Sequence, residues 1–424
     1  MSGVIPLAGG GEAFAARVLL ARTAEQTLDV QYYIWQADKT GYLLLDELRA
    51  AAERGVRLLV DENGIAGLDA ELCELDDLPN VQVRLFNPFT LRRPKPLSFA
   101  FDFFRLNRRM HNKSFTADGA ASVVAGRNVG EIYFAFGRDV HYIDTDEMAL
   151  GPAAADVSVA FDAFWDGASA DPAELILPVA PDGLARLHTA IAAARAANLS
   201  DPYLAAIGSS PLMQTLMAGP EAVELTQVTV ITADPANGLG QQGAGGLLIE
   251  TLGAILTDAA TGPTVSVDLI SAHFVHGSYA KYRPALLAGG VGLGELRADP
   301  LISQQDQTLA SLLAGYASSP HSKGLAIDGE RVFIGSFNFD PRSARLNTEM
   351  GLLIESPTFA VAMTLAVNQM MSGAHMSCAF RGRRCWNGLP AMKAAHRWYN
   401  PPNPTRHGLV GPWSRSSEYC PWSG

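Results

Sequence analysis

The chain has 424 residues, 48% of them hydrophobic and 18% charged, so it is long enough for two or three domains and too apolar to be largely disordered. Its formal net charge of −11 at pH 7 provides no general attraction to nucleic acid, and we expect no nucleic-acid partner. The four cysteines form neither a disulfide framework nor a zinc-type pair, which favours a reducing compartment.

The first elements alternate between strands and helices. An amphipathic helix is predicted over residues 11–26, followed by a strand at 28–35, a helix at 41–53 and a strand at 56–60. This order predicts a βαβ unit, and hence an α/β fold with a parallel sheet covered by helices. A further strand is expected at 81–86.

Residues 84–109 differ in character from what precedes them. They contain six phenylalanines and seven basic residues, and three prolines interrupt regular structure. One interpretation is a loop with a short helix, whose phenylalanines are buried and whose arginines are solvated. The other is an interfacial segment, whose phenylalanines enter the acyl boundary of a membrane while Arg and Lys meet anionic head groups.

A motif rich in polar residues follows this segment. It contains His111, Lys113 and Asp118, and Asn128 follows after a stretch of small residues. Alternation along a strand places His111 and Lys113 on one face, and Asp118-Gly119 is typical of a turn between two strands.

Residues 142–165 predict a strand and then an alanine-rich helix, which completes a first lobe over residues 1–167. Residues 168–225 contain one clear helix, at 183–197, and are expected to connect this lobe to a second one.

The second half of the chain repeats the first. A strand is predicted at 228–232, a helix near 244–258, and a strand at 265–275 in the place that residues 28–35 hold in the first half. The four polar residues of the motif then recur, each 210 positions later: His321, Lys323, Asp328 and Asn338. Two sets in one register indicate a duplicated unit, so residues 226–365 are expected to form the second lobe.

Two features break this symmetry. The distance from the equivalent strand to the motif is 83 residues in the first half and 56 in the second, so the second lobe is expected to be shortened. Residues 366–424 form a tail that is expected to be irregular, since from about residue 377 it shows no helical or strand period. We interpret it as a disordered terminus or an out-of-frame coding segment.

The residue types in the repeated motif suit a phosphate group. Lys113, Lys323, Asn128 and Asn338 supply cationic and amide donors, and small residues beside each Asn let a ligand approach the backbone. Two such sets facing each other would surround one phosphoryl group. A metal site is disfavoured, because Lys stands where a further ligand is needed.

The two histidines have complementary roles in this interpretation. His111 and His321 titrate near neutrality, so one can attack a phosphodiester while the other protonates the leaving oxygen. Each imidazole needs an acceptor that fixes its tautomer. Glu349, 28 residues after His321, and Asp144, 33 residues after His111, are the candidates, with Asp139 and Asp146 as rivals to Asp144. Asp118 and Asp328 belong to the same catalytic motif, but their place at turns favours bracing of the loop.

Three stretches carry a resemblance to a known family: LDVQYYIWQADKTGYLLLDELRAAAERGV, RLNRRMHNKSFTADG and GSFNFDPRSARLNTEMGL. They resemble the phospholipase D superfamily, marked by HxKx4D and a later Asn twice per active site, and within it the bacterial cardiolipin synthase C group. The resemblance covers roughly residues 12–365.

The resemblance implies two α/β lobes related by a pseudo-twofold axis, and a reaction through a phosphohistidine with no metal or cofactor. His111 and His321 would be the nucleophile and acid pair, the N-terminal one more often the nucleophile. Lys113, Lys323, Asn128, Asn338 and Ser336 would hold the phosphate.

For the narrower group, the resemblance implies transfer of a phosphatidyl unit between phospholipids such as phosphatidylglycerol and phosphatidylethanolamine, which makes cardiolipin. Hydrolysis to phosphatidic acid is the nearest alternative. A nuclease uses the same motif, but the net charge of −11 disfavours it. A non-catalytic lipid or phosphate binder is the remaining alternative.

We expect a peripheral protein on the cytoplasmic face of the cell membrane. The first residues, MSGVIPLAGGGEAF, lack the features of a signal peptide. No window approaches 18 uninterrupted apolar residues, so no membrane-spanning helix is expected.

Overall fold

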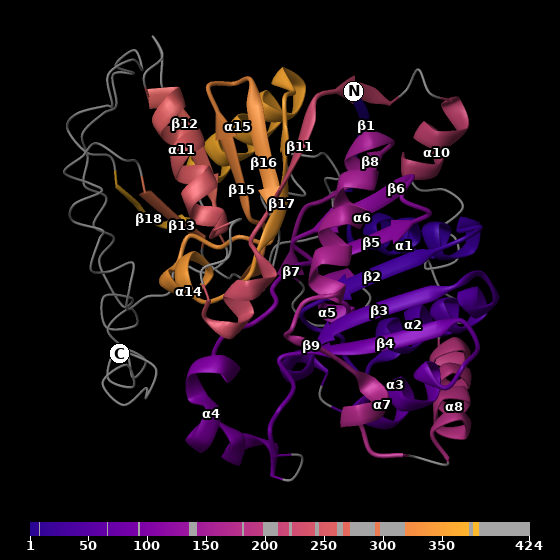
Figure 1. Ribbon diagram of the computed structural model, residues 1–424. Coiled ribbons are helices and arrows are strands. Elements are labelled where there is room, and N and C mark those ends of the chain that lie inside the picture. The colour runs from indigo at the N-terminus through magenta and orange to yellow at the C-terminus, as the bar shows by residue number, and fades with distance from the viewer. Residues whose placement is uncertain are drawn as a thin grey trace.

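A computed structural model describes residues 1–380, apart from residues 8, 66, 92–93, 135–141, 180–181, 198–210, 220–222, 242–245, 261–265, 272–292, 297–318 and 373–375. Two lobes lie side by side, each with a sheet and covering helices (Figure 1). The α/β architecture expected from the sequence is confirmed.

The first lobe is centred on a nine-stranded sheet with the order β10-β1-β8-β6-β5-β2-β3-β4-β9. The strands are β1 (Ser2–Leu7), β2 (Leu28–Tyr32), β3 (Val56–Asp61), β4 (Val81–Phe86), β5 (Ser114–Ala117), β6 (Ala121–Ala125), β8 (Asp146–Leu150), β9 (Ala170–Pro172) and β10 (Glu224–Thr226). Only β2, β3 and β4 run parallel. The expected βαβ unit is thus present, but the sheet is mixed, because the motif forms a hairpin of β5 and β6 whose strands run antiparallel.

Alternation along the strands separates the two faces of this sheet. Leu58 and Val60 of β3 face a core that includes α1 (Gly10–Thr23), α2 (Lys39–Ala51), α3 (Asp69–Asp76) and α8 (Gly183–Ala197). Leu59 faces the other side, where Phe161, Phe164 and Trp165 of α6 (Pro152–Trp165) pack. The remaining α-helices among the described residues of this part are α4 (Phe99–Leu106), α5 (Glu131–Phe134), α7 (Ala173–Ile176) and α10 (Pro211–Ala218).

The second sheet repeats five strands of the first. Its order is β11-β17-β16-β15-β12, which matches β1-β8-β6-β5-β2, and its neighbouring strands are likewise antiparallel. The strands are β11 (Val228–Thr232), β12 (Val267–Ile270), β15 (Gly324–Ile327), β16 (Arg331–Gly335) and β17 (Met350–Ile354). The described α-helices of this lobe are α11 (Leu248–Ala260), α14 (Pro341–Arg345) and α15 (Pro357–Ser372).

The asymmetries noted in the sequence have partial counterparts in the structure. Among the described residues, no strand of the second sheet takes the places of β3 and β4, and residues 272–292 and 297–318 lie outside the description. β13 (Leu293–Leu296) instead pairs with β18 (Met376–Phe380). β18 corrects the expectation that the chain has no strand after residue 377, and the tail from 381 onward lies outside the described residues.

The segment expected to connect the lobes contributes to the first sheet. It supplies the two edge strands, β9 and β10, and the helix predicted at 183–197 is α8. At the start of the chain, β1 was not predicted, since six residues containing Pro6 show no clear strand period. Its pairing with β8 comes from tertiary context.

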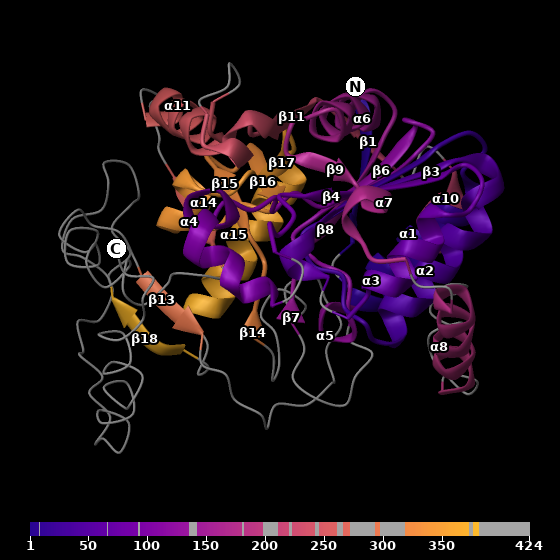
Figure 2. The ribbon, with the colours of Figure 1, turned by 60° about the horizontal axis from the view of Figure 1, so that its bottom comes forward.

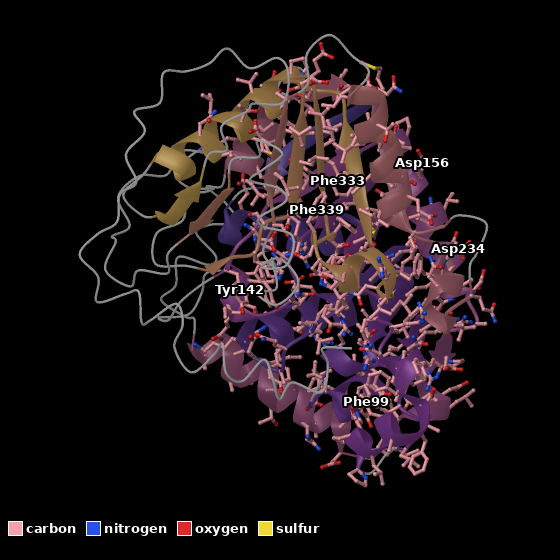
Figure 3. The ribbon with its side chains drawn as sticks, turned by 90° about the vertical axis from the view of Figure 1, so that its left-hand side faces the viewer. Phe99, Tyr142, Asp156, Asp234, Phe333 and Phe339 are labelled. Atoms are coloured by element: carbon pink, nitrogen blue, oxygen red, sulfur yellow. The ribbon has the colours of Figure 1, made fainter. Side chains whose placement is uncertain are left out.

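The two lobes share a core. Val4, Val124 and Ala149 of the first lobe cluster with Val332 and Ile334 of the second. Figure 2 shows the two sheets and α15 from a second direction, and Figure 3 shows Phe333 and Phe339 on the second lobe. Within the described residues, no helix is long and apolar enough to span a membrane.

Candidate active site

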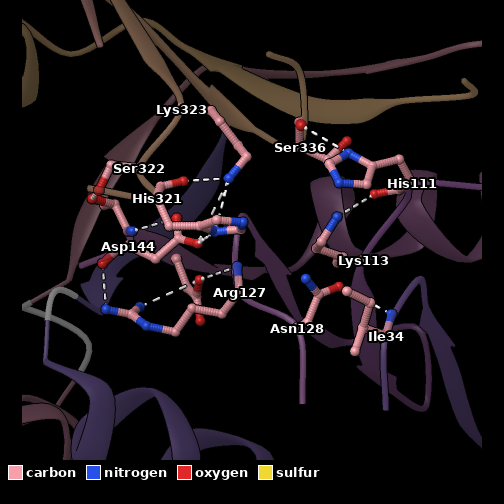
Figure 4. Close-up of polar contacts among 12 residues, drawn as sticks. Ile34, His111, Lys113, Arg127, Asn128, Asp144, His321, Ser322, Lys323 and Ser336 are labelled. Atoms are coloured by element: carbon pink, nitrogen blue, oxygen red, sulfur yellow. Dashed lines mark hydrogen bonds and ion pairs between the residues drawn. The ribbon is translucent and has the colours of Figure 1, made fainter. Parts of the chain in front are cut away.

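Two short parallel bridges cross between the lobes and position the histidines. β7 (Tyr142–Ile143) of the first lobe pairs with β14 (Ser319–Pro320) of the second. In the same way Met110 pairs with Thr348, and the backbone N–H of His111 donates to the Thr348 oxygen at 2.9 Å. Each bridge ends next to one histidine, so the duplicated motifs face each other (Figure 4).

His111 is held by residues of the second lobe. Its Nδ1 lies 2.8 Å from Oε2 of Glu349 and 3.1 Å from the backbone oxygen of Ser336. The Ser336 hydroxyl donates to the same Glu349 oxygen at 2.5 Å and accepts from the backbone N–H of Met350 at 3.0 Å. Ser336, predicted to bind phosphate, therefore uses its hydroxyl to position a carboxylate.

His321 is held by the first lobe in the same manner. Its Nδ1 contacts Oδ2 of Asp144. The Lys323 ammonium donates to the backbone oxygen of His321 and lies 2.8 Å from Nδ1 and 3.9 Å from Asp144. Because the carboxylate accepts the Nδ1 proton, we assign the tautomer in which Nδ1 carries the proton and Nε2 the lone pair, as for His111.

The carboxylates are thus exchanged between the lobes. Strand register makes Asp144 and Glu349 equivalent, since β6 pairs with β8 as β16 pairs with β17. Each lies in the sequence after one histidine but contacts the other. The sequence identified both residues, and only the structure gives their partners.

The rivals to Asp144 are placed as well. Asp146 forms buried ion pairs with Arg17 at 2.9 Å and Arg127 at 3.3 Å, so its charge is compensated elsewhere. Asp139 lies outside the described residues.

The lysines and asparagines of the motifs are buried beside the imidazoles. Lys113 donates to the backbone oxygen of His111 at 2.5 Å and is fully buried. The Asn128 carbonyl oxygen accepts from the backbone N–H of Ile34 at 3.1 Å. The carbonyl oxygen of Asn338 is buried and has no hydrogen-bond partner among the described residues. The two asparagines therefore differ in how firmly they are fixed.

Asp118 and Asp328 are placed apart from the histidines. Asp118 is at the far end of β5, where its carboxylate accepts from the backbone N–H groups of Glu25, Gln26 and Thr27 at 2.8 Å each. Asp328 accepts from the backbone N–H of Ser266 at 2.8 Å. Both have positive φ, as in a type I′ hairpin turn. These contacts favour the bracing role over a chemical one.

Three tyrosines that the sequence analysis did not single out line the site. Tyr33 lies edge-on to His111 with ring centroids 5.0 Å apart. Tyr142 stacks on His321 at 5.1 Å, and Tyr133 lies edge-on to the same ring at 5.4 Å. The aromatic run at 31–35 and the strand start at 142 carried no signal beyond a buried strand, so these contacts were not predictable.

Burial controls the ionisation of the site. It lowers the pKa of His111 to about 4, opposed by Glu349, and that of His321 to about 3, where Lys323 adds to the lowering and Asp144 opposes it. Burial also lowers the pKa of Lys113 to about 7 and of Lys323 to about 8, opposed by Glu349 and Asp144 respectively. Both imidazoles are therefore neutral at pH 7, as a nucleophile must be.

This arrangement fits chemistry on a phosphate ester. Two neutral imidazoles with fixed Nδ1 protons stand beside two lysine side chains, whose ammonium forms stabilise negative charge. Among the described residues, no three His, Cys, Asp or Glu side chains are grouped as a metal site.

Comparison with known proteins gives concordant results. Residues 295–371 match the family model described as "Cardiolipin synthase, PLD-like domain". The chain is 40% identical over 396 residues to cardiolipin synthase C of Escherichia coli (strain K12), covering 84% of this chain and 82% of that protein. It is 27% identical over 453 residues to an uncharacterised protein of Helicobacter pylori (strain 26695), covering 98% of this chain and 88% of that protein.

Among solved structures, phosphatidylserine synthase of Haemophilus influenzae Rd KW20 aligns with a TM-score of 0.53 at 16% identity, covering 98% of this chain and 93% of that one. This similarity supports the fold.

Proposed function

Because the chain belongs to the cardiolipin synthase C family of the phospholipase D superfamily, and so is a phospholipase D-type phosphatidyltransferase, we propose that it makes cardiolipin from two phospholipids through a phosphohistidine. Phosphatidylglycerol is the proposed acceptor, because its head group carries a free hydroxyl, and a second phosphatidylglycerol or a phosphatidylethanolamine is the proposed donor of the phosphatidyl unit. No cofactor enters this reaction.

The proposed reaction has two displacements at one phosphorus atom. In the first, Nε2 of one histidine forms a bond to phosphorus, the bond to the leaving head-group oxygen breaks, and the other histidine donates a proton to that oxygen. In the second, the hydroxyl of the acceptor lipid gives its proton to the histidine that acted as the acid and attacks phosphorus. The bond from phosphorus to the nucleophilic histidine then breaks. Lys113, Lys323, Asn128 and Asn338 are proposed to bind the phosphate oxygens throughout.

The observation that carries the proposal is the pair of exchanged hydrogen bonds. Glu349 at His111 and Asp144 at His321 each accept the Nδ1 proton, so Nε2 is the nitrogen that attacks phosphorus in one histidine and carries the transferred proton in the other. A bound phosphodiester brings negative charge, which favours the protonated form of the imidazole that acts as acid.

Lipid substrates place the reaction at a membrane surface. We infer that the protein is peripheral to the inner face of the cell membrane. Protease accessibility in right-side-out and inverted membrane vesicles tests the sidedness: digestion only in inverted vesicles supports the inner face.

The test of the reaction is separation of lipid products by thin-layer chromatography. Labelled phosphatidylglycerol is supplied with and without phosphatidylethanolamine, and cardiolipin is the expected product. Phosphatidic acid as the sole product would instead assign hydrolysis. Cleavage of DNA without lipid turnover would assign a nuclease, and no turnover at all a binding protein.

The covalent intermediate has its own test. Enzyme quenched with denaturant at mildly alkaline pH, because the P–N bond of a phosphohistidine hydrolyses in acid, is digested and analysed by mass spectrometry and is expected to carry a phosphatidyl group on one of the two histidines. His111→Asn and His321→Asn then identify which one: the label disappears in the variant that lacks the nucleophile. Turnover without label at either histidine would remove the covalent mechanism.

A further inference from the structure

The helix α4 carries an unusual exposed surface. Four apolar side chains around it, which we call the aromatic face, are largely exposed: Leu97 at 49%, Phe101 at 76%, Phe103 at 36% and Phe104 at 85%. No phenylalanine elsewhere in the described residues reaches this exposure. Single exposed apolar side chains are ordinary, but a contiguous group marks a surface that another apolar phase covers.

The backbone beneath these side chains is not one regular helix. Leu97 lies in the short 3₁₀ helix Lys95–Ser98, whereas Phe101, Phe103 and Phe104 lie on α4, where the rings of Phe103 and Phe104 pack at 5.7 Å. Asp102 departs from helical geometry, with φ −137° and ψ 35°, and its carboxylate pairs with Arg105. The apolar face of an ordinary surface helix points to the core, whereas here it points outward.

The opposite side of α4 is fixed to the protein. Leu106 is fully buried, and the Ser98 hydroxyl accepts from the backbone N–H of Leu91 at 2.8 Å. The rings of Phe89 and Phe99 pack at 5.7 Å, and Arg109 lies 5.7 Å from both ring centroids. The exposed phenylalanines therefore sit on an anchored element (Figure 3, Phe99).

The position of α4 links it to the active site. Asn107, directly after the helix, accepts from Arg342 of the second lobe through its side chain at 2.9 Å and its backbone oxygen at 3.0 Å. His111 follows Leu106 by five residues. In Figure 1, α4 projects from the body of the molecule below α14, at the junction of the lobes.

Some basic side chains of this segment form ion pairs within the protein, whereas Arg84 and Arg108 donate to backbone oxygens. Lys95 pairs with Glu62 and Asp69, both at 3.0 Å, and Arg105 pairs with Asp102. This differs from the interfacial interpretation of the sequence, in which basic residues meet anionic head groups. Arg92 and Arg93 lie outside the described residues.

We propose that the aromatic face is the membrane-docking surface of this protein, which inserts into the acyl boundary of a phospholipid bilayer and holds the active site at the lipid surface. Insertion of apolar side chains, and not attraction between charges, supplies the affinity. This inference rests on the proposed function in one respect: the phospholipid substrate of the proposed reaction is the reason for choosing a phospholipid bilayer as the docking partner.

The experiment compares Phe101→Ser/Phe104→Ser with a matched control, Val159→Ser/Leu175→Ser, whose original side chains are 68% and 73% exposed on other helices. Sedimentation with sucrose-loaded vesicles of phosphatidylglycerol and phosphatidylethanolamine measures binding. The phenylalanine variant is expected to bind at least about tenfold more weakly, and the control as the unmodified protein. Binding of the unmodified protein is expected to change little when salt is raised from low to about 0.5 M, because salt screens charges and not apolar contacts.

Equal binding by all three proteins would overturn the proposal, as would loss of most vesicle binding in high salt. Binding lost equally in the control would also overturn it, because the effect would then not belong to the aromatic face. Reversible dimers of the unmodified protein that disappear in the phenylalanine variant, with no vesicle binding, would assign this face to a second copy of the chain.

A soluble substrate separates this inference from the proposed function. With short-chain phosphatidylglycerol below its critical micelle concentration, the phenylalanine variant is expected to retain turnover while its turnover on vesicles falls. Absence of turnover on any phospholipid by the unmodified protein would count against the proposed function and leave the vesicle-binding result intact. Equal loss on both substrates would mean that α4 supports the site itself and would overturn the docking role.

Discussion

Glu349 and His111 belong to different lobes and are 238 residues apart in the sequence, yet Oε2 of one lies 2.8 Å from Nδ1 of the other. The pair is buried, and the Ser336 hydroxyl donates to the same carboxylate oxygen. Asp144 and His321 repeat the contact with the lobes reversed.

Replacing this carboxylate tests its role as a positioning group. Glu349→Gln is expected to lower kcat by roughly two to four orders of magnitude, because an amide can present its N–H₂ to Nδ1 and favour the wrong tautomer. KM should change little, since the carboxylate does not bind substrate. Glu355 is exposed and follows the other end of β17. Glu355→Gln is therefore the matched control and should retain full activity.

The histidines themselves are expected to be indispensable. His111→Ala and His321→Ala should each reduce turnover by about a thousandfold or more while leaving the thermal transition close to that of the unmodified protein. His188→Ala on α8, an exposed histidine, serves as the control. Substantial residual activity in either site variant would contradict a site shared by both lobes.

The buried lysines predict a pH dependence. Since burial lowers the pKa of Lys113 to about 7 and of Lys323 to about 8, their positive charge is lost as pH rises through this range. kcat/KM should therefore fall above about pH 7–8, whereas kcat should fall at higher pH, because bound phosphate favours the ammonium form. Calorimetric binding of tungstate should weaken over the same range. A fall confined to the region near pH 10 would contradict this prediction.

Gly126 predicts a steric requirement at the first lobe. A Cβ at this position would lie 2.1 Å from Oδ1 of Asp144, so Gly126→Ala should displace that carboxylate from His321. We expect a loss of activity of about tenfold or more, accompanied by a smaller loss of stability. Gly253→Ala, where a Cβ meets nothing within 4 Å, is the control, and equal activities of the two variants would contradict the prediction.

Asp118 distinguishes bracing from chemistry. Burial alone would raise its pKa, but the three backbone N–H donors together lower it, so the carboxylate is charged and engaged. Asp118→Ala should lower the free energy of unfolding by about 1–2 kcal/mol and leave kcat nearly unchanged. A large loss of kcat with unaltered stability would return Asp118 to the catalytic group.

The repeat made much of this site predictable. The histidines, lysines and asparagines of the two motifs recur at a constant offset in the sequence. They were therefore expected to occupy equivalent positions in the two lobes. The βαβ unit and helix α8 followed from periodicity, because their apolar positions are regular. The histidine partners of Asp144 and Glu349 could not be predicted from the sequence. The spacing of residues within one lobe does not show which of them face the other lobe. The hydrogen bond from Ser336 to Glu349, within the second lobe, was not predicted either, because it depends on the pairing of β16 with β17.

The paired bridges of Met110 with Thr348 and of β7 with β14 constrain how such a chain can change. Each lobe supplies the carboxylate that orients the histidine of the other lobe. Replacing one lobe by that of a distant relative would disturb the orientation of both imidazoles, because the histidine of the retained lobe would also lose its carboxylate partner. The two halves are therefore inherited as a matched pair.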